Sequence, residues 1–213
     1  YDHETTRKKG AHEIMLSHFA NHRADILIGT QMLSKGLDLP LVTLVGVILA
    51  DVGLNLPDFR TNERVFQLLT QVSGRAGRSP LGGRVVLQTF NPGHYVIQHA
   101  AQHDYDGFYD QELKYRERMA YPPYTRLVRL ETRDMNNILA EQRAHALAED
   151  LKVWLAEGKF TATRIIGPSP CFFHKINNYY RWQVILNGPA PANVIKGKAL
   201  EGWMVEIDPP SLL

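Results

Sequence analysis

The spacing of apolar residues divides the first part of the chain into helices and strands. Two near-continuous apolar runs, residues 25–29 and 41–50, predict buried strands of a parallel sheet that is covered on both faces. Thr5 or Thr6 is a candidate cap for a helix that precedes them. The apolar stripe of that helix consists of Ala11, Ile14, Met15, His18 and Phe19. This arrangement predicts an α/β fold around a parallel sheet.

A second amphipathic helix is predicted at residues 61–72, with Thr61 as its candidate cap. Its apolar side chains recur at helical spacing, at Val65, Leu68, Leu69 and Val72. Because this face must pack on the sheet, we expect the end of the helix to be rigid. Residues 84–89 predict another strand. Residues 93–119 predict two helices, the second with core-type side chains on one side, at Tyr105, Phe108, Tyr109 and Glu112.

The remaining pattern predicts a second domain. A helix cannot continue into Pro122-Pro123, and proline keeps the residue before it extended. We therefore place the boundary between residues 1–120 and 121–213. The later segments predict strand, helix, strand, strand, short helix and strand, at 126–132, 136–155, 164–166, 179–186, 192–200 and 203–207, with a Gly-Pro-Ser-Pro loop at 167–170. That order is typical of a small α+β ferredoxin-like domain.

Composition narrows the class of protein. With 213 residues and 44% hydrophobic content, the chain can fill real cores. The net charge of +2 means that any contact with nucleic acid must come from local patches. Cys171 is the only cysteine, which excludes a disulfide framework and fits a reducing cytoplasm. We expect no membrane span and no signal peptide. Because Tyr1 follows no initiator Met, we expect a segment of a longer chain.

The string QVSGRAGR, Gln71 to Arg78, carries the first candidate chemistry. Arg75 and Arg78 are three residues apart and each follows a glycine, so both guanidinium groups can leave the same face. Such groups suit the charge that builds on a transferring phosphoryl group. On the string alone, a helix stop with solvated arginines is an equally good interpretation. No Gly-Lys pair is followed by Ser or Thr, so the chain has no phosphate loop of its own.

A second string, ILIGTQMLSKGLDLP at residues 26–40, lies upstream. Together the two strings resemble motifs V and VI of superfamily 2 helicases, which lie on the second of two RecA-like lobes. The resemblance implies that Thr30, Gln31 and Lys35 contact DNA. It implies that Gly36 and Asp38 lie near the nucleotide. It also implies that the motif VI residues Gln71, Arg75 and Arg78 are catalytic and reach the nucleotide phosphates.

Longer strings are more specific. GTQMLSKGLDLPLVTLVGVILAD, PDFRTNERVFQLLTQVSGRAGR, GGRVVLQTFNP and RERMAYPPYTRL closely resemble the PriA family of primosomal replication-restart helicases (primosomal protein N′), from Thr5 to Trp182. The resemblance implies a bacterial, cytoplasmic, nucleoid-associated, monomeric 3′ to 5′ DNA helicase that recognises stalled or repaired forks and restarts replication by primosome assembly. It also implies ATP with Mg²⁺, which needs a first lobe absent from this chain, so the chain alone is expected to be inactive. Zinc is expected only in an upstream Cys-rich module.

The partners implied by the resemblance are forked and single-stranded DNA, single-stranded DNA-binding protein, primosome proteins and the loader of the replicative helicase. A fork-recognition and protein-docking platform without motor function is therefore an alternative. In the second domain, Arg181 and Trp182 are candidate DNA contacts, with Arg126, Arg129 and Arg133 along a nearby strand. The alternative is that Trp182 fills the core and the strand arginines face water.

Two further carboxylates are left open by the sequence. Asp51 ends an apolar strand, as a metal-binding Asp of an ATPase does, but without a phosphate loop a structural role or a place at the lobe gap is expected. Asp58 and Arg60 flank Phe59, and a local ion pair around a buried Phe competes with a contact to DNA or to another lobe.

Overall fold

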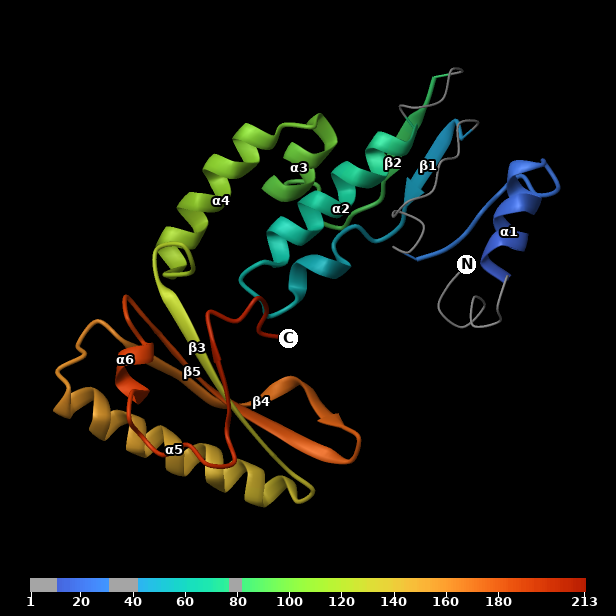
Figure 1. Cartoon of the computed structure of the whole chain (residues 1–213). Helices are drawn as coiled ribbons and strands as arrows, with labels where there is room; N and C mark the ends of the chain where they lie inside the picture. The colour runs from blue at the N-terminus through green and yellow to red at the C-terminus, as the bar shows by residue number, and fades with distance from the viewer. Residues whose placement is uncertain (1–10, 31–41, 77–81) are drawn as a thin grey trace. The chain divides into compact units, whose positions relative to one another are not determined.

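The structure is a computed structural model that describes residues 11–30, 42–76 and 82–213 (Figure 1). The chain divides into two compact units, Tyr1–Asn55 with Asn62–Tyr109 and Leu56–Thr61 with Asp110–Leu213. The division falls inside helix α4 (Tyr105–Met119), before the predicted boundary at residue 120. The short stretch Leu56–Thr61 also belongs to the second unit, which no local pattern indicated. Whether either unit folds as an independent domain stays a prediction.

The first unit contains a parallel pair of strands, as an α/β lobe requires. Strand β1 (Leu44–Val47) pairs with β2 (Arg84–Leu87), and Val45 lies opposite Val85. A 3₁₀ turn η2 (Val52–Asn55) and helix α2 (Thr61–Ala76) come between the two strands in the chain. Parallel strands need such a crossover, because their ends lie far apart. The predicted α/β class of this unit is confirmed.

Two strand predictions in the first unit were wrong in detail. Residues 25–29 form no strand, and Ile26 and Ile28 are 76% and 77% exposed. The run at 41–50 is a strand only over β1, where exposed and half-buried residues alternate. A short apolar run predicts burial, but a strand also needs a neighbour that pairs its backbone groups. Within the described residues, this sheet consists of β1 and β2.

The core of the first unit is built on α2. Leu69 is almost fully buried, and the Phe66 ring stacks on Phe108 of α4 with centroids 4.0 Å apart and planes within 5°. Val65 is also buried, whereas Leu68 and Val72 of the predicted stripe are only half-buried. The buried face of α2 is therefore rotated toward Phe66. Helix α1 (Ala11–Ala20) forms over the predicted apolar stripe, while its candidate caps, Thr5 and Thr6, lie outside the described residues. None of the described side chains of α1 is buried.

Helices α3 (Tyr95–Gln102) and α4 follow β2, as predicted for residues 93–119. Only part of the predicted α4 stripe is core. Phe108 and Glu112 are buried, and Glu112 accepts a 2.7 Å hydrogen bond from Arg116 Nε. Tyr105 and Tyr109 are 61% and 49% exposed, so they lie at the edge of the aromatic cluster and not inside it.

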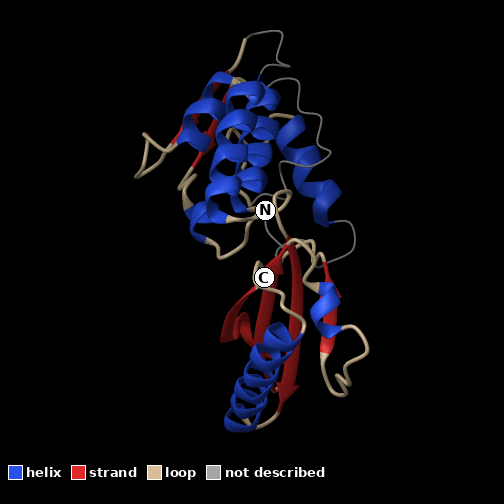
Figure 2. Cartoon of the chain, turned by 90° about the vertical axis from the view of Figure 1, so that its left-hand side faces the viewer, coloured by secondary structure: helices blue, strands red, loops and turns tan. Residues whose placement is uncertain are grey.

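The second unit is a four-stranded antiparallel sheet with one long helix, and its predicted ferredoxin-like fold is confirmed (Figure 2). The strands lie in the order β4-β5-β3-β6, each antiparallel to its neighbour. This is the split βαβ arrangement. In chain order the elements are β3 (Arg126–Asp134), α5 (Asn137–Glu157), β4 (Arg164–Ile176), β5 (Tyr179–Gly188), α6 (Ala192–Ile195) and β6 (Met204–Ile207).

Helix α5 covers one face of this sheet. Asn136 caps it, because its side-chain oxygen accepts a hydrogen bond from Ile138 N at 2.9 Å. The predicted stripe packs on the sheet, with Leu155 half-buried and Ala144, Leu147, Ala148 and Leu151 buried against Val128, Leu130, Val184 and Leu186. The second predicted helix is a single turn, α6. None of the helices in the described part of the chain is both long and apolar enough to cross a membrane.

Strand β4 differs from its prediction. It runs through residues 167–170, which were predicted as a loop, and its register with β5 shifts between Ile166 and Ser169 and again between Pro170 and Lys175. Because β4 is an edge strand, Pro168 and Pro170 are tolerated there. Asn177 and Asn178 both have positive φ, 49° and 67°, as the two-residue turn of a tight hairpin requires.

Candidate functional site

The helix end predicted to carry the phosphate-binding arginines is anchored by packing. Leu69 and Ser73 are buried on the inner side of α2, while Gln71 is exposed. The backbone of Arg75 lies in the last turn of α2. The side chain of Arg75 and all of Arg78 lie outside the described residues. The structure therefore gives the position of the helix and leaves the direction of the guanidinium groups as a prediction.

The candidate motif V residues fall mostly outside the described part of the chain. Thr30 is described and exposed. Gln31, Lys35, Gly36 and Asp38 lie outside the described residues. The nucleotide and DNA roles of these positions consequently stay predictions.

Asp51 joins the carboxyl ends of β1 and β2. Its Oδ1 accepts a hydrogen bond from Thr89 Oγ1 at 2.5 Å and its Oδ2 accepts one from Phe90 N at 2.8 Å. The Thr89 hydroxyl, followed by the backbone N–H of Phe90, lowers the pKa of Asp51 and keeps it ionised. A structural role for Asp51 is therefore favoured. It fixes the sheet edge at which open α/β sheets bind ligands.

Asp58 and Phe59 also have structural contacts. Phe59 is buried beside Leu127 and Ile185. Asp58 accepts hydrogen bonds from Arg60 N, at 2.9 Å, and from Leu212 N and the Ser211 hydroxyl near the end of the chain. Thr61, the candidate cap of α2, donates a hydrogen bond from its hydroxyl to the carbonyl oxygen of Leu56 at 3.0 Å.

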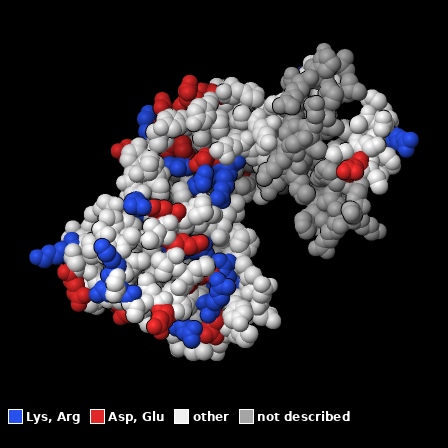
Figure 3. All heavy atoms as spheres, in the orientation of Figure 1, with Lys and Arg blue, Asp and Glu red and all other residues white. Residues whose placement is uncertain are grey.

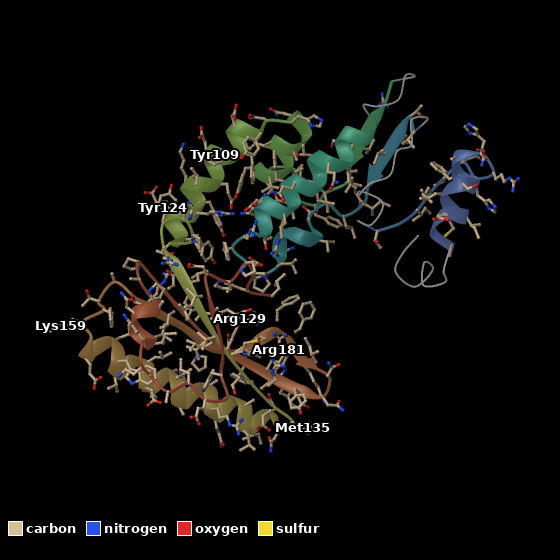
Figure 4. All side chains as sticks on the ribbon, viewed as in Figure 1. Tyr109, Tyr124, Arg129, Met135, Lys159 and Arg181 are labelled. Atoms are coloured by element: carbon tan, nitrogen blue, oxygen red, sulfur yellow. The ribbon has the colours of Figure 1, made fainter. Side chains whose placement is uncertain are left out.

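In the second unit, the sheet face opposite α5 carries a buried charge cluster (Figure 4). Arg181 contacts both carboxylate oxygens of Glu131, with Nε to Oε1 at 2.7 Å and Nη2 to Oε2 at 2.6 Å. Arg129 Nη2 lies 2.7 Å from the same Oε2. The side chains of Arg129 and Glu131 are 4% and 1% exposed, and that of Arg181 is 14% exposed. Arg133 adds a longer contact of 3.9 Å from the exposed side.

These contacts determine the charge state of the cluster. Burial acts to raise the pKa of Glu131, but the hydrogen bond from Arg181 and the charges of Arg181, Arg129 and Arg133 lower it overall. Conversely, the hydrogen bond to Glu131 raises the pKa of Arg181. Burial raises the pKa of the Cys171 thiol, whose Sγ lies 3.6 Å from Arg129 Nη2. Cys171 is thus a buried neutral thiol, as predicted from its sequence context.

All three strand arginines proposed as DNA contacts have carboxylate partners in this unit, with the longest contact, 3.9 Å, at Arg133. Arg129 is buried in the cluster, and Arg126 forms an ion pair with Asp208. Arg133 remains 55% exposed. The signal for the cluster was present in the sequence, because alternate residues of a strand share one face and therefore place Arg129, Glu131 and Arg133 together.

Trp182 belongs to the core under α5. It is 8% exposed, and its Nε1 donates a 2.9 Å hydrogen bond to Asn137 Oδ1. His174 Nε2 lies 3.0 Å from the same oxygen. The structure favours the core interpretation of Trp182, since little of the ring is available to stack on a base. A DNA contact at Arg181 or Trp182 stays a prediction.

Basic side chains gather where the β4–β5 hairpin lies (Figure 3). The nearby carboxylates are those already engaged by arginines. Among the described residues there is no group of three or more His, Cys, Asp or Glu side chains that could hold a metal ion.

Comparison with known proteins gives the family. Residues 3–80 match the model described as helicase conserved C-terminal domain, and residues 117–210 match the one described as primosomal protein N C-terminal domain. The chain is 46% identical over 195 residues to the replication restart protein PriA of Synechocystis. The aligned region covers 92% of this chain and 23% of the relative. The chain belongs to the PriA family of replication restart proteins.

Other PriA proteins give the same result. The PriA protein of Bacillus subtilis is 44% identical over 209 residues, and the aligned region covers 97% of this chain and 26% of that protein. The PriA protein of Haemophilus influenzae is 36% identical over 189 residues, and the aligned region covers 89% of this chain and 25% of that protein. The chain spans about a quarter of the length of these curated relatives. The primosomal match coincides with most of the second unit, and the helicase match includes both candidate motifs.

Proposed function

We propose that the protein to which this chain belongs is an ATP-dependent 3′ to 5′ DNA helicase that recognises stalled or repaired replication forks and restarts replication by primosome assembly. The observation that carries the proposal is the helicase C-terminal match over residues 3–80, which includes every candidate motif residue of the first unit. The PriA relatives supply the connection with replication restart.

In this proposal the first unit forms one wall of a nucleotide site. Arg75 and Arg78 direct guanidinium groups at the ATP phosphates, and Gln71 lies one turn earlier on the same helix. The burial of Leu69 supports the assignment, because a packed helix can hold such groups within the narrow distance range that phosphoryl transfer needs. Thr30, Gln31 and Lys35 contact a DNA strand from the motif V loop, and Gly36 and Asp38 lie beside the nucleotide.

The proposed cofactor is ATP with Mg²⁺, held mainly by an upstream lobe. The two arginines suit phosphate oxygens. The family resemblance assigns Mg²⁺ binding mainly to the upstream lobe and any structural zinc to an upstream Cys-rich module. Hydrolysis of bound ATP would supply the free energy for translocation. The side chains of this chain stabilise charge and orient the phosphates.

The test is turnover by the full-length protein. Arg75→Ala and Arg78→Ala are each expected to lower DNA-stimulated ATPase by about 10³- to 10⁵-fold, the effect of removing a phosphate-stabilising arginine, with fork binding nearly unchanged. Arg84→Ala is the matched control, since Arg84 is exposed at the start of β2. Wild-type turnover in the Arg78 variant would remove that residue from the site.

A second candidate is a docking platform that binds forks and replication proteins without motor work. The observation that favours it is the primosomal C-terminal match over residues 117–210, a unit with no nucleotide motif. Its partners would be forked DNA, single-stranded DNA-binding protein and primosome proteins. The Arg78→Ala protein separates the two candidates. Replication restart that persists without ATPase would identify the platform as the essential activity.

A further inference from the structure

A cavity of about 590 Å³ opens on the sheet face opposite α5, within the second unit. Its apolar end consists of Leu127 and Ile185, and its walls include Tyr115, Tyr121 and Phe172. Asp58 also lines it, but its carboxylate already accepts several hydrogen bonds. The cavity is open to solvent, and polar groups of Ser169 and Gln183 line it beside the apolar and aromatic side chains.

Gln183 lines the cavity and has a buried side-chain oxygen without a partner among the described residues. Its side chain is buried, with 8% exposure, and its Oε1 has no hydrogen-bond donor among the described residues. A buried acceptor without a donor is destabilising, and native structures keep few of them. Its place beside a cavity indicates a ligand that donates a hydrogen bond to Gln183.

Two consecutive phenylalanines of β4 lie at or next to the cavity. Phe172 lines the cavity and is 47% exposed, and Phe173 is 53% exposed. Their rings lie 5.0 Å apart and nearly perpendicular. Arg181 Nη1 donates a 3.3 Å hydrogen bond to the carbonyl oxygen of Phe173, which ties this part of β4 to the charge cluster. Exposed rings in a fixed position are the platforms on which unpaired bases stack.

The β4–β5 hairpin beside the cavity is poor in acidic residues. No Asp or Glu occurs between Glu157 and Glu201, a stretch that contains the whole β4–β5 hairpin. The stretch carries the cations Lys159, Arg164, Lys175, Arg181, Lys196 and Lys198. Lys175 is exposed on the hairpin, with its Nζ 4.6 Å from the centre of the Tyr180 ring. Arg181 is paired with Glu131 and Lys198 with Glu157. An exposed cation such as Lys175 can still contact a phosphate backbone, even though the chain as a whole is nearly neutral.

We infer that the cavity and the β4–β5 hairpin bind single-stranded DNA, with one unpaired base inserted against Phe172 and hydrogen-bonded to Gln183 Oε1. Unpaired bases are recognised in this way, through stacking and through their exposed pairing edges. Lys175 neutralises a neighbouring phosphate. The choice of DNA as the anionic partner rests on the proposed function, because an acidic peptide shares the charge.

The first test compares two oligomers bound to the 213-residue chain. One is labelled single-stranded DNA, and the other is an abasic deoxyribose-phosphate oligomer of equal length. The wild-type chain is expected to bind the base-bearing oligomer about tenfold tighter or more, as stacking predicts. The double variant Phe172→Ala, Phe173→Ala is expected to lose this preference. Phe90→Ala is the matched control, because Phe90 is 82% exposed in the first unit.

The second test separates a ligand contact from a structural role. Gln183→Leu removes the unpartnered acceptor with little change of volume, so the melting temperature is expected to rise. Affinity for base-bearing DNA is expected to fall several-fold, while affinity for the abasic oligomer stays the same. A Gln183 with only a structural role would alter stability alone, and that result would overturn the inference.

The third test concerns the phosphate contact. Lys175→Ala is expected to reduce the slope of log affinity against log salt concentration by about 0.7, the value for one phosphate on a single strand. Lys114→Ala, on the exposed side of α4, is the control and is expected to leave the slope unchanged.

Three results would overturn the inference. They are equal affinity for the two oligomers, no binding of DNA by the chain, and Phe172-dependent binding of an acidic peptide in place of DNA. None of these measurements uses ATP, and none changes Arg75 or Arg78. Failure of the base site is therefore distinguishable from failure of the proposed ATPase.

Discussion

Arg181 and Glu131 form a two-point ion pair across neighbouring strands, with both carboxylate oxygens within 2.7 Å of guanidinium nitrogens. Arg129 contacts the same carboxylate from its own strand. Glu131 thereby pairs with two buried or largely buried guanidinium groups, and Glu206 adds a 3.5 Å contact to Arg129 Nη1. Arg181, predicted as a DNA contact, here positions β4 and β5.

Glu131→Gln is expected to lower the free energy of unfolding by about 3–5 kcal/mol, because it removes the counter-charge of Arg181 and leaves Arg129 with only the longer contact to Glu206. The measurement is chemical denaturation of the 213-residue chain. The control is Glu149→Gln. Its carboxylate is 70% exposed and pairs only with Lys152 on the helix surface, so the effect should be below about 0.5 kcal/mol. Similar losses in both variants would contradict the assignment.

The same carboxylate predicts a dependence of stability on pH. The pKa of Glu131 is lower in the folded state than in the unfolded chain, so the folded state holds the ionised form more strongly. The stabilisation is fully present above the ordinary pKa of a glutamate, roughly 4.3, and is lost as the pH falls through the folded pKa. Denaturation between about pH 6 and pH 3 should show this decline. Glu131→Gln should make it shallower, and an unchanged slope would argue against the cluster.

Trp182 is expected to stabilise the second unit. Trp182→Ala should lower the free energy of unfolding by about 3–5 kcal/mol, as for other buried aromatic residues. Trp182→Phe keeps the packing and loses the Nε1 hydrogen bond to Asn137, so its loss should be nearer 1 kcal/mol. Single-stranded DNA binding by the Phe variant should match the wild type. A selective loss of DNA affinity at full stability would restore Trp182 as a DNA contact.

The packing of Leu69 is expected to hold the end of helix α2 in position. Leu69→Ala should destabilise the first unit by about 2–5 kcal/mol, because the residue is 1% exposed and packs in the cluster of α2, α3 and α4. In the full-length protein, ATPase should fall at temperatures well below unfolding, since the helix end that carries Arg75 is then less firmly held. Gln67→Ala, on the exposed face of the same helix, is the control. Unchanged activity in the Leu69 variant would separate helix packing from catalysis.

The sequence predicted those elements whose pattern is local and long. Helix α5 combines a cap, Asn136, with an apolar stripe from Ala144 to Leu155, and it was placed within two residues at each end. The ferredoxin-like order followed from the alternation of strand and helix. The motif strings identified the family because their exact residue sequences are specific to it. Recognising a sequence motif requires no knowledge of how the side chains pack.

The missed features depend on partners far away in the chain. Residues 25–29 are apolar enough for a strand, yet burial and pairing are set by neighbours that a short run does not reveal. The pairs Asp51–Thr89 and Asp58–Ser211 join residues that are 38 and 153 positions apart. For the candidate nucleotide site, Arg78 and Asp38 lie outside the described residues, so their predicted roles rest on the motif resemblance.

The membership of Leu56–Thr61 in the second unit has a practical consequence for dissecting the protein. Phe59, from that stretch, covers Leu127 and Ile185 together with Tyr121 and Leu212. A truncated product starting at residue 121 leaves Phe59 behind and opens this hydrophobic surface to solvent, which favours self-association during purification. Expression boundaries for the C-terminal part should therefore begin before Leu56, or Phe59 should be supplied on a grafted peptide.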